Sequence, residues 1–160
     1  MSAVIQLPVA RTARARKAQP RNAAVTEATL TAKQKKLIRE SFGKIEPARD
    51  LVAQLYCHKL FRLDPGLRGK FAGPVEIQAR KFSAAMKLAL ITLGHDDGLK
   101  PMLKLLGARH RQLGIRVRHY RTMARALMWT LEQSLEKRFT RETKDAWNAF
   151  LNQTTRALTT

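Results

Sequence analysis

The stretch LGARHRQLG, residues 106–114, places a histidine on the apolar side of a predicted helix. Leu99, Leu103 and Leu106 precede His110 at spacings of four, three and four residues, so all four side chains share one helix face. Gly114 is predicted to end this helix. A lone histidine on such a face is more often a core residue bonded to a carbonyl than a ligand, so its role depends on the rest of the chain.

The sequence before this stretch has the start and stop signals of successive helices. Thr31 and Gln34 form a capping-box pattern, and Pro47 suits the first turn of the next helix. Asp64-Pro65 predicts a short helix that ends near Phe71, and an apolar stripe from Val75 to Leu93 predicts a long one closed by Gly94. Residues 96–98 read Asp-Asp-Gly and predict a turn.

The sequence after it continues in the same way. Apolar stripes at helical spacing run from Tyr120 to Leu135 and from Trp147 to Leu158, and Thr140 is predicted to begin the last helix. No useful length of sequence alternates with a period of two residues, as a half-buried strand would. The predicted fold class is therefore all-α, with six to eight helices.

Length and composition indicate one domain with a basic extension. A chain of 160 residues with 44% hydrophobic residues suits a single globular domain, and no apolar run reaches the roughly 20 residues that span a bilayer. Residues 1–28 contain five Arg or Lys and one acid without apolar periodicity, so we predict a disordered basic tail before a domain over residues 29–160. A targeting segment is the alternative interpretation of this tail. The single cysteine, Cys57, leads us to expect a reducing cytoplasm.

Several segments at mutually consistent separations resemble the globin family. LGARHRQLG, His119-Tyr120 and residues 127–132 are similar to the helix that ligates haem iron in globins and the helix after it. Residues 60–71 are similar to the corner where globins place a phenylalanine against the haem. The resemblance extends from about Thr31 onward and is closest to bacterial single-domain haemoglobins and the globin domain of flavohaemoglobins. It implies a globin-like fold that encloses one haem b.

The resemblance also implies roles for individual residues. His110 would ligate the iron, Phe71 would pack against the haem and Gln78 would be the distal residue. Neutral imidazole is a good axial ligand for haem iron, and the amide of Gln78 can donate to a bound diatomic ligand. The wider set of haem-contacting residues would be Cys57, Phe71, Gln78, Phe82, Leu106, His110, Val117, Tyr120 and Met123.

Two distal positions depart from the family pattern. Counting back from Phe61, the usual oxygen-contacting tyrosine is replaced by Cys57, and Tyr56 is its neighbour. Neighbours on a helix point about 100° apart, so we do not expect Tyr56 to serve instead. Phe82, one turn after Gln78, adds bulk to the distal side. The expected pocket is tight and weakly polar.

A proximal departure concerns activity. Tyr120 matches a tyrosine that joins a glutamate in flavohaemoglobins to polarise the iron-ligating histidine, but the matching glutamate would fall about two residues beyond Thr160. The resemblance therefore favours reversible binding of oxygen or another diatomic ligand. A nitric oxide dioxygenase or peroxidase-like enzyme with a separate reductase is the first alternative. A basic helical nucleic-acid-binding protein without haem is the second.

The charge of the chain indicates acidic partners. The formal net charge is +19, and no acid occurs between Asp97 and Glu132, where eight Lys and Arg residues flank His110. A solvated surface with one or two charges pairing with haem propionates is one interpretation. A docking surface for an acidic reductase or an anionic membrane or polymer is the other.

Overall fold

The computed structural model describes residues 29–160, and the predicted basic tail over residues 1–28 lies outside the described residues. Helices connected by short turns make up the described part: α1 (Ala32–Ile45), η1 (Glu46–Ala48), α2 (Arg49–Leu63), η2 (Pro65–Lys70), α3 (Val75–Ile91), α4 (Asp96–Gln112), α5 (Val117–Leu135), η3 (Glu136–Arg138) and α6 (Arg141–Thr159), where η denotes a 3₁₀ helix. No strand occurs within residues 29–160. The all-α prediction is confirmed.

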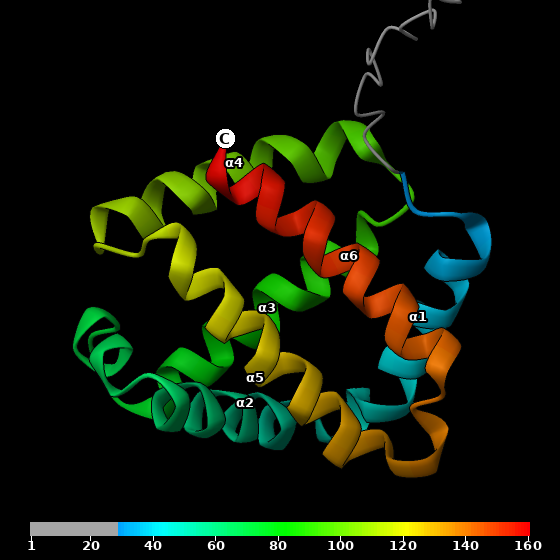
Figure 1. The fold of residues 1–160 in the computed structure, drawn as a ribbon, viewed down its shortest axis with the longest axis horizontal. Coiled ribbons are helices and arrows are strands. Elements are labelled where there is room, and N and C mark those ends of the chain that lie inside the picture. The colour runs from blue at the N-terminus through cyan, green and yellow to red at the C-terminus, as the bar shows by residue number, and fades with distance from the viewer. Residues whose placement is uncertain (1–28) are drawn as a thin grey trace, which may run out of the picture.

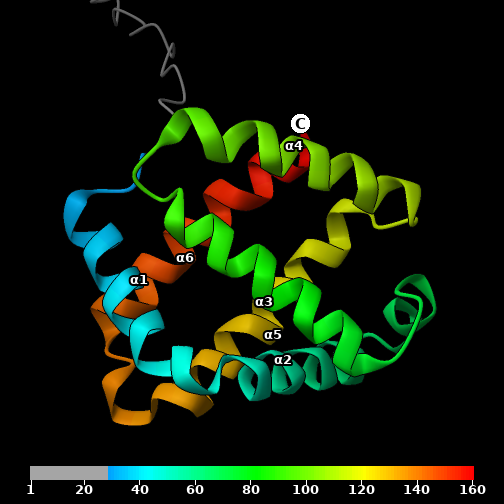
Figure 2. The same ribbon diagram turned by 180° about the vertical axis from the view of Figure 1, so that it is seen from behind.

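The helices form a sandwich around a shared core. α3 lies on the opposite face of the molecule from α5 and α6, as the two views in Figures 1 and 2 show. α2 packs against both α3 and α5, whereas α6 packs against α1 and α4. The largest fully buried side chains are contributed by α1, η2, α5 and α6: Ile38, Leu67, Thr130, Leu131, Leu135, Trp147 and Phe150.

The predicted helix boundaries are confirmed where capping signals are strong. Thr31 and Gln34 form both bonds of the capping box that opens α1, and the Thr140 hydroxyl accepts the Thr143 N–H at the start of α6. Gly114 has a φ of 74°, a left-handed conformation that glycine adopts without strain, and it follows the end of α4 as predicted.

One boundary prediction is wrong. Residues 96–98 do not form a separate turn, because α4 already begins at Asp96. The Gly98 N–H bonds the His95 carbonyl oxygen at 3.1 Å. That bond is equally compatible with an isolated turn and with the first turn of a helix, so the Asp-Asp-Gly pattern alone does not separate the two.

Tight contacts fix α6 against its neighbours. The Trp147 indole N–H donates to Ser41 Oγ of α1 at 2.9 Å, within the core. At the other end of α6, a Cβ added to Gly107 of α4 would lie 2.0 Å from the Leu158 carbonyl oxygen. The α4 backbone therefore touches the α6 backbone one helical turn before His110.

Candidate functional site

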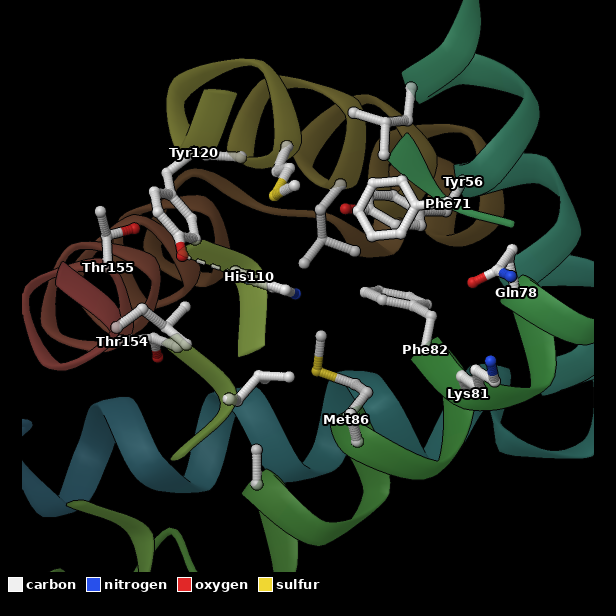
Figure 3. Close-up of a pocket in the computed structure, with 18 of the residues that line it drawn as sticks. Tyr56, Phe71, Gln78, Lys81, Phe82, Met86, His110, Tyr120, Thr154 and Thr155 are labelled. Atoms are coloured by element: carbon white, nitrogen blue, oxygen red, sulfur yellow. Dashed lines mark hydrogen bonds between the residues drawn. The ribbon is translucent and has the colours of Figure 1, made fainter. Parts of the chain in front are cut away.

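A largely apolar cavity of about 390 Å³ separates α3 from α4. Side chains from η2, α2, α5 and α6 complete its walls, and Figure 3 shows the polar and aromatic groups that reach it. Its volume falls within the roughly 300–1,000 Å³ of small-molecule and cofactor pockets. The cavity therefore lies against the face of α4 that carries His110.

His110 is held with its ring directed into this cavity (Figure 3). The residue lies near the end of α4, where its carbonyl oxygen accepts the Ile115 N–H at 2.9 Å. Its Nδ1 is 3.2 Å from the Tyr120 hydroxyl oxygen of α5. Burial lowers the pKa of His110 below its usual value, which favours the neutral imidazole. A neutral ring anchored at Nδ1 is suited to coordinate a metal through Nε2.

Phe71 lies beside His110, in the segment that follows η2. The two rings meet edge to face with centroids 6.2 Å apart, and Phe61 approaches Phe71 at the same centroid distance. An aromatic edge against the imidazole restricts how far His110 can rotate. Phe71 therefore lines the cavity beside His110, and its contact with haem stays a prediction.

Tyr56 reaches the cavity, contrary to the expectation from helix geometry. Its ring is stacked on Phe82 at 3.9 Å between centroids and 19° between planes. No hydrogen bond of its hydroxyl occurs among the described residues, and burial raises the pKa of the hydroxyl above the usual value. Because α2 packs against both α3 and α5, its buried arc is wide enough to include the adjacent residues Tyr56 and Cys57.

Gln78 lines the cavity but turns its amide to the backbone. The side-chain nitrogen donates to the Ala72 carbonyl oxygen, and Figure 3 places the residue beyond Phe82 as seen from His110. One N–H of the amide is thereby committed to a loop contact. A distal role for Gln78 stays a prediction.

The remaining predicted residues divide into two groups. Cys57, Phe82, Leu106, Tyr120 and Met123 all line the cavity, and burial raises the pKa of the Cys57 thiol to about 11. Val117 does not line it, because it is the first residue of α5 and its side chain is 64% exposed. Tyr120, one turn further into α5, is the residue that reaches His110.

Sequence analysis allowed one or two charges to pair with haem propionates, but it did not identify Lys70 and Lys81 as residues of the cavity wall. Lys70, Lys81 and Arg109 line it, whereas no Asp or Glu of the described part does. Lys81 follows Gln78 by one helical turn, and Arg109 adjoins His110. Their positions relative to these two predicted site residues could have identified them as wall residues. Met86 was missed in the same way, one turn beyond Phe82 on the same stripe of α3.

The residues present fit haem better than a bare metal ion. Within the described part of the chain, nowhere do three His, Cys, Asp or Glu side chains gather as a metal site would require. His110 offers one nitrogen ligand, and a porphyrin supplies the other in-plane ligands itself. The apolar walls suit the macrocycle, and the three cations suit its two carboxylates.

Comparisons with known proteins agree with this geometry. A family model described as Globin matches residues 56–158, which is more than half of the chain. Among solved structures, one titled as a hexacoordinated heme protein from an anhydrobiotic tardigrade superposes with a TM-score of 0.74 at 19% identity. The match covers 81% of this chain and 93% of that one, and at this identity it shows a shared fold.

Proposed function

The chain belongs to the globin family, and on that premise we propose that it binds one haem b in the cavity, with His110 as the axial ligand. The observation that carries the proposal is the anchored imidazole: its Nδ1 is bonded to Tyr120, and its ring points into an apolar hollow (Figure 3). When bound, haem supplies an iron centre that takes oxygen or another diatomic ligand.

Lys70, Lys81 and Arg109 are proposed to hold the haem carboxylates. None of the three forms an ion pair with another described residue, so their charges are available. Charge-assisted bonds to a carboxylate are about twice as strong as neutral ones. They would orient the macrocycle with its carboxylates at the basic part of the wall.

The distal side is proposed to bind a diatomic ligand through Tyr56. The free hydroxyl lies within a weakly polar wall of Phe82, Met86 and Cys57, so a hydrogen bond donated there meets little competition from water. Gln78 is the second candidate donor, through the amide N–H that Ala72 does not occupy. Reversible ligand binding requires only this donor and an apolar pocket.

The residues that line the cavity indicate how many protein ligands the haem iron would have. The tardigrade protein is described as hexacoordinated, but His110 is the only histidine among the described residues that line this cavity. A second imidazole ligand is therefore not provided by this cavity wall. The sixth position is proposed to be open to the diatomic ligand.

An enzymatic function is the second candidate, on the strength of the bond between Tyr120 and His110. A nitric oxide dioxygenase or peroxidase-like activity would need the histidine to be polarised further, as a carboxylate behind the tyrosine would do. No carboxylate of the described part lines the cavity. The geometry therefore favours ligand binding, and the resemblance to bacterial haemoglobins and the cytoplasmic location stay predictions.

The test is the absorption spectrum of the purified chain after reconstitution with haem. Wild-type protein and His58→Ala, which changes an exposed histidine outside the cavity, are expected to show the same Soret band. His110→Ala is expected to lose haem on gel filtration, because no other histidine of residues 29–160 lines the cavity. Undiminished haem retention in His110→Ala would refute the ligand, and a wild-type chain that binds no haem would favour the nucleic-acid-binding alternative.

A further inference from the structure

Exposed cations and one exposed apolar side chain meet where α4 turns into α5. The turn and η2 lie at the same end of the molecule in both Figures 1 and 2. Arg111, Arg116, Arg118 and Arg121 are exposed along it, and Val117 is 64% exposed between two of them. We call this surface the basic corner: Lys70, Arg111, Arg116, Val117, Arg118 and Arg121.

Lys70, Arg116 and Arg118 of the basic corner lie close enough to His119 to act on its charge. A Cβ built on Gly114 would lie 3.0 Å from Lys70 Nζ, so the Lys70 ammonium from η2 sits against the turn. Arg118 Nε is 3.4 Å from His119 Nε2, next to the first turn of α5. After burial, which has the largest effect, the charges of Arg118, Lys70 and Arg116 also lower the pKa of His119.

Acidic groups offset little of this charge. Asp64 faces the corner from the end of α2, with its Oδ2 4.0 Å from His119 Nε2, and it raises the His119 pKa against the cations. No carboxylate of the described part pairs with Arg111, Arg116, Arg118 or Arg121. The corner is a strongly positive surface with an apolar tip.

We propose that the basic corner docks on an anionic phospholipid surface. The four arginines of the corner would contact lipid phosphates and carboxylates, and Val117 would enter the headgroup region. Membrane-surface proteins combine these two contributions, apolar side chains at the interface and Lys or Arg around them. A specific protein partner would instead need about 800 Å² of complementary surface with an apolar centre, and a single valine on a projecting turn offers no such centre.

This surface adjoins the proposed haem site. Lys70 belongs to the basic corner and also lines the cavity, so docking would bring the cavity wall close to the lipid. Oxygen and nitric oxide are apolar and dissolve more readily in hydrocarbon than in water. Docking would therefore bring the proposed haem site close to a membrane interior in which the diatomic ligand is more concentrated than in water. This consequence rests on the proposed function, whereas lipid binding itself does not depend on haem.

The experiment is co-sedimentation of the full chain with large vesicles, at low and at physiological salt. Vesicles of phosphatidylcholine with phosphatidylserine are expected to retain the protein, and vesicles of phosphatidylcholine alone are not. R116Q/R118Q/R121Q is expected to weaken retention on the order of a hundredfold, since each cation near an anionic surface contributes about fivefold. Circular dichroism would verify that the variant is folded.

A matched control distinguishes the contribution of the basic corner to vesicle binding from that of the net charge. K137Q/R138Q/R141Q removes the same number of exposed cations from η3 and α6, at the other end of α5, and is expected to bind vesicles almost as wild type does. Equal weakening by the two triple variants would overturn the proposal, because binding would then depend on total charge only.

The variant Val117→Ser distinguishes docking on a lipid surface from binding to an acidic macromolecule. Loss of the apolar tip is expected to weaken vesicle binding severalfold, in line with the burial of part of one valine. Binding to soluble polyglutamate should not respond to this substitution. Polyglutamate binding as tight as vesicle binding, with no effect of Val117→Ser on either, would assign the corner to an acidic partner and refute lipid docking.

Discussion

The contact between His110 and Tyr120 would determine which imidazole nitrogen binds iron in the proposed haem complex. If the Nδ1–H donates to the Tyr120 oxygen, the proton is fixed on Nδ1 and the Nε2 lone pair faces the cavity. A free imidazole would divide its population between two tautomers and several ring orientations. The tyrosine thus prepares the ligand in advance, and it comes from the helix that follows α4 in the chain.

Tyr56→Phe is expected to raise the dissociation rate of oxygen by up to about tenfold, because a hydrogen bond contributes on the order of 1 kcal/mol. The variant keeps the ring that stacks on Phe82, so the pocket should retain its shape. Stopped-flow displacement of oxygen by carbon monoxide gives the rate. Gln78→Leu is the comparison: if Gln78→Leu accelerates dissociation more than Tyr56→Phe does, the glutamine is the main donor.

The resemblance implied residues that do lie together in the fold, although their roles toward haem stay predictions. His110, Phe71 and Tyr120 line the cavity, and so do Cys57, Gln78 and Phe82. Tyr56 was excluded because a single helix was considered in isolation. The two neighbours of α2 widen its buried arc, and that information lies in the tertiary packing.

Among the described glycines, Gly107 has the least space for a side chain, because α4 crosses α6 there. Gly107→Ala would put a methyl group onto the Leu158 carbonyl, whose position is fixed by backbone rather than by a flexible side chain. Forced helix separation of this kind typically costs about 1–3 kcal/mol. We expect a lower thermal midpoint and weaker haem retention, since His110 lies one turn away on the same helix.

Gly43→Ala is the matched control, because a Cβ there meets nothing within 4 Å in the interior of α1. It should stabilise the protein by roughly 0.5–1 kcal/mol through helix propensity. Thermal unfolding monitored by circular dichroism measures both variants. A Gly107→Ala protein as stable as Gly43→Ala would mean that α4 and α6 separate without cost.

The start of α5 depends on a neutral histidine. His119 Nδ1 accepts the Arg116 N–H at 2.8 Å, and its ring is buried. Burial, and then the Arg118 charge, lower its pKa, so the unfolded chain binds a proton at about pH 6.5 and the folded chain only at lower pH. Between those two values the unfolded state holds more protons, and stability must fall as pH decreases.

His119→Gln is expected to remove this part of the pH dependence. Urea unfolding at neutral pH and at mildly acidic pH would give the free energies, and the wild type should lose more stability than the variant over the interval. Carboxylates that titrate at lower pH affect both proteins alike. Parallel losses in the two proteins would show that His119 does not titrate between its folded and unfolded values.

At the scale of the described molecule, sequence signals predict the fold well. For the surface they predict the net charge, but they do not predict where the charged side chains gather. Helix caps and apolar spacing are local, so the boundaries at Thr31, Gly114 and Thr140 could be predicted. The run of cations after Asp97 was visible in the sequence, whereas the approach of Lys70 from η2 to that run depends on the fold. None of the helices within residues 29–160 has the length and apolar character to cross a membrane.

Net charge is expected to limit the stability of the whole chain. A formal charge of +19 produces self-repulsion that is strongest in the compact state. Raising ionic strength from 0.01 M to 0.1 M shortens the screening length from about 30 Å to about 10 Å, so we expect the thermal midpoint to rise with sodium chloride. K137Q/R138Q/R141Q should show a smaller rise. A midpoint that falls with salt would instead indicate that attractive ion pairs dominate.

The cavity between α3 and α4 has a consequence for how much of this protein a cell accumulates. Its walls come from η2 and from α2 to α6, so much of the apolar surface of the fold faces one hollow. A newly made chain that has not yet acquired haem exposes this surface to water and opens more often, and opened chains are the ones that proteases degrade. Supply of the cofactor would then set the lifetime of the polypeptide, and haem starvation would lower its abundance without any change in its synthesis.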